Sequence, residues 1–145
     1  MGDVLSSKDL VMRDTENFKD SFVHMADVGF ITHNGVKILY EDYSQSKPQE
    51  TIALLKKAEV IISGEPRNSV LALVNVKDSH FDTDLSTALK DFVKKNTPYI
   101  KCSAVYGVEG LKEIIFKGII AFTGRKNLVL FKTLEKAKDY LANLK

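Results

Sequence analysis

The stretch from Tyr99 to Phe131 constrains the fold of this chain more strongly than any other part of its sequence. An apolar run over residues 100–106 is typical of a buried strand, and it ends at Gly107. From Gly110 onward the apolar residues follow a helical period, and the face that they form consists of Leu111, Ile114, Ile115, Gly118, Ile119 and Phe122. A second apolar run over residues 128–131 follows, so the stretch predicts a parallel strand–helix–strand unit.

The end of this predicted helix is marked by Gly124. A glycine after the last apolar turn favours the left-handed conformation that ends many helices. Arg125 and Lys126 come next, and the negative end of a helix favours cations. We therefore expect a positive φ angle at Gly124 and two cations that stabilise the helix end.

The rest of the chain predicts a hairpin followed by alternating helices and strands. Asn34-Gly35 separates two strand-like runs and favours a type I′ turn. Ser46-Lys47-Pro48-Gln49 has a capping-box spacing and a proline suited to a first helical turn, and an apolar strand over residues 70–76 follows. Asp82 or Thr83 can cap the next helix, and a further helix closes the chain. The predicted fold class is α/β, with an N-terminal β-hairpin and a mixed, mainly parallel sheet.

The length of 145 residues suits one domain with one core. Residues 1–26 have no steady apolar stripe, and we expect an N-terminal extension that is weakly helical or irregular. The α/β domain is predicted over residues 27–145.

Composition and charge exclude several classes of protein. The chain has 21 Lys and Arg against 19 Asp and Glu, a formal net charge of +2, and nucleic-acid binding needs clustered basic residues. No apolar run approaches the ~18 residues of a membrane span, and the N-terminus lacks a signal-peptide pattern. We expect a cytoplasmic protein without a transmembrane span. Cys102 is the single cysteine, and we expect it to be a small buried side chain without a disulfide.

Three motifs resemble a known family. They are Pro98 to Leu111, Phe122-Thr123-Gly124-Arg125, and Phe131 to Ala137. They look like an uncharacterised bacterial family related to sporulation anti-sigma-factor antagonists (SpoIIAA-like), which belongs with the STAS domains and shares a chain path with CRAL-TRIO lipid-binding domains. The resemblance covers roughly Val28 to Leu144. It implies a STAS-like single domain that binds a partner or a ligand.

The resemblance also directs attention to the loop after the central strand. In antagonists of anti-sigma factors, a serine at the start of the following helix is phosphorylated within an Asp-Ser-Ser/Thr-Gly pattern. Here the loop begins Asp78-Ser79-His80-Phe81, which matches only the first two residues, and Asp82-Thr83 is a second partial match. A helix start stabilises phosphate, but the aspartates Asp78, Asp82 and Asp84 would repel it. Asp78, Ser79, Asp82 and Thr83 are therefore a candidate regulatory loop, with ordinary helix capping favoured.

No catalytic constellation is predicted. Ser79, His80 and Asp82 have the residue types of a hydrolase, but they lack a nucleophile-elbow motif. The three histidines are scattered without a metal-ligand spacing, and the stretch Gly107 to Gly110 lacks a dinucleotide-binding pattern. We expect no enzymatic activity, no cofactor and no metal.

Two functions remain open. The favoured one is a non-enzymatic protein-interaction or regulatory module, and the alternative is a domain that binds a lipid or another small apolar ligand. A deep apolar cavity between helices and sheet would favour the ligand carrier, whereas a filled core with an apolar outer patch would favour interaction.

The predicted interaction surface lies on the helix that follows Gly110. Counting ~100° per residue places Phe116 and Ile120 opposite the predicted inward face, with Lys112 and Lys117 at their border. If uncovered, this pair would anchor a homodimer, a protein partner or a membrane surface. The other interpretation is that a segment of the same chain, such as the one containing Phe18 and Phe22, covers the pair.

Overall fold

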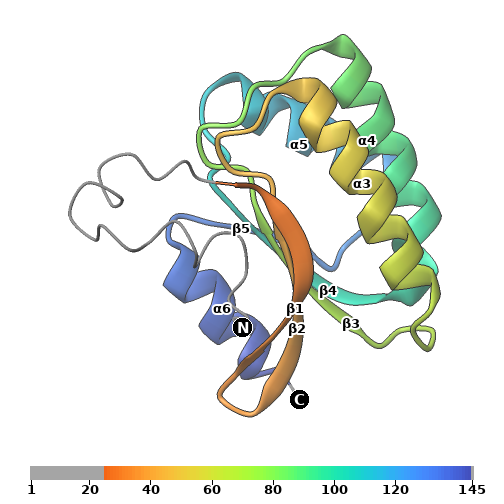
Figure 1. Cartoon of the computed structure of the whole chain (residues 1–145), viewed down its shortest axis with the longest axis vertical. Helices are drawn as coiled ribbons and strands as arrows, with labels where there is room; N and C mark the ends of the chain where they lie inside the picture. The colour runs from red at the N-terminus through yellow and green to blue at the C-terminus, as the bar shows by residue number, and fades with distance from the viewer. Residues whose placement is uncertain (1–24, 145) are drawn as a thin grey trace, which may run out of the picture.

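A five-stranded sheet forms the centre of the domain, and helices cover both of its faces (Figure 1). The computed structural model describes residues 25–144. The strands are β1 (Asp27–His33), β2 (Val36–Asp42), β3 (Val70–Asn75), β4 (Ile100–Tyr106) and β5 (Leu128–Phe131). The helices are α3 (Pro48–Ser63), α4 (Thr83–Asn96), α5 (Leu111–Thr123) and α6 (Leu134–Ala142), with a short 3-10 turn over Thr97–Tyr99 before β4.

The strands follow one another in the sheet in the same order as in the sequence. β1 and β2 pair antiparallel, and the later neighbours β2–β3, β3–β4 and β4–β5 pair parallel. This confirms the predicted α/β class, the N-terminal hairpin and the mixed, mainly parallel sheet. The predicted extension over residues 1–26 lies almost entirely outside the described residues, so the proposed division of the chain stays a prediction.

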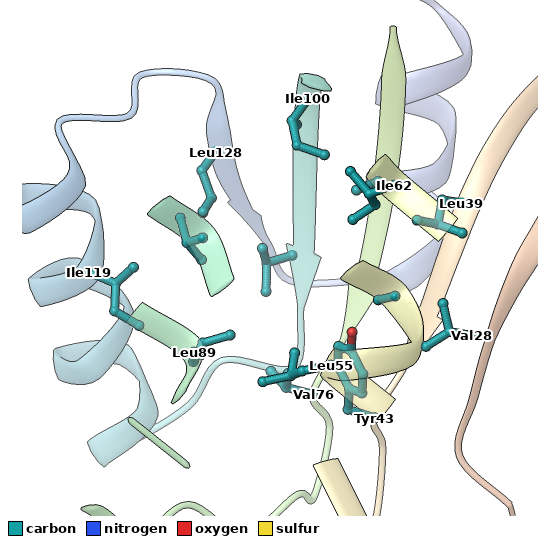
Figure 2. Close-up of a cluster of buried hydrophobic side chains, with 14 of the residues drawn as sticks. Val28, Leu39, Tyr43, Leu55, Ile62, Val76, Leu89, Ile100, Ile119 and Leu128 are labelled. Carbon is teal, nitrogen blue, oxygen red and sulfur yellow. The ribbon is translucent and has the colours of Figure 1, made fainter. Parts of the chain in front are cut away.

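The helices are distributed unequally over the two faces of the sheet. α3, α4 and α5 lie on one face and α6 lies on the other (Figure 1). Alternate side chains of each strand point to opposite faces of the sheet. In β3, Ala72 packs in the core under α3, α4 and α5, and Leu73 packs in the core under α6. Figure 2 shows side chains from α3, α4 and α5 pointing towards the strands, among them Leu55, Ile62, Leu89 and Ile119.

Local signals explain how the elements begin. The hairpin turn has φ angles of 51° at Asn34 and 78° at Gly35, as a type I′ turn requires. Asp82 caps α4 by accepting a hydrogen bond from the Leu85 backbone at 2.8 Å. The predicted cap of α3 by Ser46 is wrong, because Lys47 is its N-cap and the Lys47 N–H donates to the Glu50 carboxylate at 2.7 Å. Among the described helices, none is long and apolar enough to cross a membrane.

Four described glycines have positive φ angles, which other residues adopt with strain, and two of them lie at the ends of α5 and β4. Gly124 ends α5 with a φ angle of 70°, which confirms the predicted left-handed stop. Gly107 follows β4 with a φ angle of 93° and lies directly against the backbone of Lys77, which follows β3. The ends of β3 and β4 therefore approach each other more closely than a side chain at position 107 allows.

Alanine substitutions should separate these two constraints. A Cβ at position 124 would have nothing within 4 Å, whereas one at position 107 would clash with the backbone nitrogen of Lys77. We expect Gly124→Ala to lower the free energy of unfolding by about 1 kcal/mol through backbone strain, and Gly107→Ala by roughly 2–4 kcal/mol because the clash adds to the strain. Urea denaturation measures both. Equal losses would show that the close approach to Lys77 does not constrain the fold.

Candidate functional site

The loop after β3 is held closed by its own hydrogen bonds. The Ser79 hydroxyl donates to the Val76 carbonyl oxygen at 2.7 Å, and the Ser79 backbone N–H donates to the same oxygen at 3.2 Å. Ser79 is only 7% exposed, although its neighbour Asp78 is exposed and has a φ angle of 58°. In this conformation the hydroxyl is turned into the protein, so its phosphorylation requires the loop to open. The regulatory role of Ser79 stays a prediction.

The second half of the loop is the start of α4. The Asp82 carboxylate already accepts the hydrogen bond from Leu85, so the capping role expected of this residue is present. Thr83 is the first residue of the helix and is exposed. Of the two candidate phosphorylation sites, Thr83 is therefore the accessible one, and the Asp82 carboxylate beside it would repel a phosphate.

Two lysines lie at this loop, Lys77 within it and Lys112 beside it. Lys112 of α5 donates to the Val76 carbonyl oxygen at 2.7 Å, and burial lowers the pKa of Lys112. Lys77 forms an ion pair with Glu109 at 2.8 Å. An open cleft of about 450 Å³ lies next to them, at the carboxyl ends of β3, β4 and β5. Its lining consists of Lys77, Tyr106, Gly107, Val108, Glu109, Gly110, Glu113, Phe131 and Lys132.

The structure corrects the predicted orientation of α5. Phe116, expected on the outside, is 2% exposed in the core, and Ile120 is partly buried against the same core. Three residues of the predicted inward face are instead exposed: Leu111 by 68%, Ile114 by 69% and Phe122 by 59%. The prediction failed because α5 carries apolar residues all round, so counting them does not reveal which side is buried.

We name the exposed apolar residues of this helix the α5 outer face. They are Leu111, Ile114, Gly118, Ala121 and Phe122.

Charged side chains border the α5 outer face. The Nζ atom of Lys90, on the neighbouring helix α4, lies 4.8 Å from the centre of the Phe122 ring. Lys117, predicted at the border, is exposed and pairs with Glu113 at 2.8 Å, one helical turn away. Lys112, the other predicted border residue, is turned towards the end of β3. An apolar stripe with a charged rim is the arrangement seen in many protein interfaces.

Sequence reasoning missed two groups of buried polar side chains under α3, α4 and α5, which line one cavity and are called here the polar network. Glu41 of β2 is 2% exposed and accepts a hydrogen bond from the Tyr43 hydroxyl at 2.7 Å. Arg125, expected as a cation at the helix end, is 6% exposed and donates to the Ser103 hydroxyl at 3.1 Å and to the side-chain Oδ1 of Asn127 at 2.9 Å. Glu41 follows the apolar Leu39 by two residues, so both side chains point to the face that α3, α4 and α5 cover. This spacing is the sequence signal that could have predicted the burial of Glu41.

The network encloses little space. A cavity of about 30 Å³ is lined by Glu41, Tyr43, Ser103 and Arg125 together with apolar residues of the three helices. This volume matches about one water molecule. Burial raises the pKa of Glu41 to about 7, although the Tyr43 hydrogen bond and the Arg125 charge act in the opposite direction. Such a group resembles a general base in pKa, but a cavity of this size does not hold a substrate.

The buried carboxyl should make stability depend on pH. The folded pKa of Glu41 is about 7 and its ordinary value is 4.5, so between these values the folded state holds a proton that the unfolded state has lost. Glu41 should therefore lower the free energy of unfolding as pH rises from 4.5 to 7, by roughly 3 kcal/mol in total.

Glu41→Gln keeps an acceptor for Tyr43 and removes this titration. Urea denaturation of both proteins between pH 5 and pH 8 should show a difference in stability that shifts in favour of Glu41→Gln as pH rises. A difference that stays constant across this range would contradict the raised pKa.

Comparison with known proteins supports the fold. No protein-family model matches the chain, and no curated protein matches it either. Among solved structures, an uncharacterised protein of the DUF3478 family from Shewanella loihica PV-4 aligns with a TM-score of 0.63 and 16% identity, over 83% of this chain and 97% of that one. That protein is described as having a SpoIIAA-like fold. The chain therefore has the SpoIIAA-like fold that its motifs predicted.

Proposed function

We propose that this chain is a non-enzymatic protein-interaction module of the cytoplasm whose docking surface is the α5 outer face. The observation that carries the proposal is the exposure of three large apolar side chains on one helix: Leu111, Ile114 and Phe122. Together they present roughly 400 Å² of apolar surface, within the range of the largest patches on monomeric proteins, which are often functional. Val60, by contrast, is a single exposed apolar residue on α3 and needs no explanation.

The packing of the core supports interaction over transport of an apolar ligand. A carrier of the CRAL-TRIO kind needs space for its ligand between helices and sheet, and drug-sized ligands occupy about 300–1,000 Å³. The cavity at that place measures about 30 Å³ and is lined in part by Glu41 and Arg125. The larger cleft at the carboxyl ends of the strands is open and bordered by the Lys77–Glu109 ion pair, which does not suit an apolar molecule.

Photo-cross-linking in living cells of the native host tests this proposal. Benzoylphenylalanine replaces Ile114 in the α5 outer face, and a matched variant carries it at the equally exposed Val60 on α3. We expect a covalent adduct with a protein, identified by mass spectrometry, from position 114 and not from position 60. The absence of an adduct at 114, or equal adducts at both positions, would refute a docking role.

Vesicle flotation tests a membrane as the occupant of the same face. The purified chain is mixed with vesicles of phosphatidylethanolamine and phosphatidylglycerol, with Ile114→Ser as the comparison. We expect neither protein to float. Flotation of the unmodified chain that is lost in Ile114→Ser would assign the face to a lipid surface and contradict the proposal.

A further inference from the structure

We propose that the partner on the α5 outer face is a second copy of this chain, packed so that the two α5 helices run antiparallel about a twofold axis. The inference rests on the proposed function, since it names the occupant of the same face. Three observations carry it: the order of side-chain sizes along the helix, an exposed glycine in its interior, and the positions of two charges beside the apolar stripe.

The sizes of the side chains change along the stripe. Its first half carries the large residues Leu111 and Ile114, and its second half carries the small residues Gly118 and Ala121, followed by the large Phe122 at the end of the helix. In an antiparallel pair, Leu111 of one copy lies over Ala121 of the other, and Ile114 lies over Gly118. Both pairs have the same midpoint, position 116, so one twofold axis satisfies them together. Leu111 then also lies beside Phe122 of the second copy.

Gly118 has no role inside the described domain that requires a glycine. It lies in the middle of α5, where glycine destabilises a helix relative to alanine, and an added Cβ would have nothing within 4 Å. Its φ angle is also not in the left-handed region. Close packing of a second helix would explain the glycine, because a residue without a side chain leaves a groove into which Ile114 of the other copy fits.

The charges at the border favour the antiparallel orientation. At ~100° per residue, Glu113 and Lys117 both lie on one flank of the stripe. In an antiparallel pair the twofold axis is perpendicular to the helices, and it brings this flank against the same flank of the second copy. In the antiparallel arrangement Glu113 lies about 3 Å along the helix axis from Lys117 of the other copy, whereas a parallel pair would place this flank beside the opposite flank of the second copy, where Glu113 and Lys117 do not meet.

The area of contact sets the expected strength. The three large side chains supply roughly 400 Å² on each copy, about half of the surface that a stable complex buries per partner. Their neighbours on the rim, including Lys90 of α4 and Lys117, add to this. We therefore expect a weak dimer with a dissociation constant in the micromolar range rather than an obligate one.

Sedimentation equilibrium of the full chain between about 1 µM and 1 mM tests the association. We expect dimers that weaken at least tenfold in Ile114→Glu and in Gly118→Leu, and that persist in the control Val60→Glu. Gly118→Leu is the sharper variant, because it adds apolar surface and favours the helix, so its melting temperature should not fall. A chain that stays monomeric up to 1 mM, or a Gly118→Leu variant that dimerises as well as the unmodified chain, would overturn the proposal.

Cysteine pairing tests the orientation. Leu111→Cys and Ala121→Cys are prepared separately in the full chain, where the native Cys102 is buried, then mixed and mildly oxidised. The antiparallel pair predicts disulfides mainly between the two different variants. Disulfides mainly within Leu111→Cys alone, as a parallel pair would give, or no disulfides beyond those of a Val60→Cys control, would overturn it.

The mass of the photo-adduct from position 114 separates this inference from the proposed function. An adduct of twice the mass of the chain supports the dimer. An adduct with a different protein as the main product overturns the dimer and leaves the docking role intact, and the absence of any adduct refutes both.

Discussion

The right-handed sense of strand–helix–strand connections is the constraint on which the rest of this structure depends. Every parallel step moves from one strand to its next neighbour in the same direction, so all three crossover helices lie on one face of the sheet (Figure 1). α3 packs on α4, and α4 packs on α5. α5 is therefore the last helix of its layer, and the described part of the chain leaves its outer face uncovered. The candidate docking surface follows from the topology together with the apolar residues on that face.

The same layer of helices encloses the polar network of Glu41 and Arg125. Glu41 lies on β2, and Arg125 lies in the loop between α5 and β5. Arg125 donates a hydrogen bond to Ser103 of β4, a strand between β2 and β5 in the sheet. The Arg125 charge lowers the pKa of Glu41, but burial raises it further, so the uncharged form of Glu41 is favoured below about pH 7. These polar side chains line one small cavity between the helices and the sheet, which leaves little internal space for a ligand.

Most of the fold could be predicted because its signals are local. Asn34-Gly35 determines a turn, Asp82 and Gly124 determine helix ends, and the apolar run over 100–106 is buried on both sides. The orientation of α5 could not be predicted in this way, because the helix is apolar all round and only its neighbours decide which side is buried. The local sequence likewise predicts that Arg125 is a cation at the helix end, but tertiary packing buries its side chain against Ser103 instead.

α5 buries Phe116 in the core and leaves Ile114 exposed, where the proposed partner would contact it. The most direct test compares the free energies of unfolding of Phe116→Ala and Ile114→Ala, measured at concentrations where the protein is monomeric. We predict a loss of about 3–5 kcal/mol for Phe116→Ala, as for other buried phenylalanines, and at most about 0.5 kcal/mol for Ile114→Ala. A large loss for Ile114→Ala with little change for Phe116→Ala would show that the helix faces the other way and would contradict this orientation of α5.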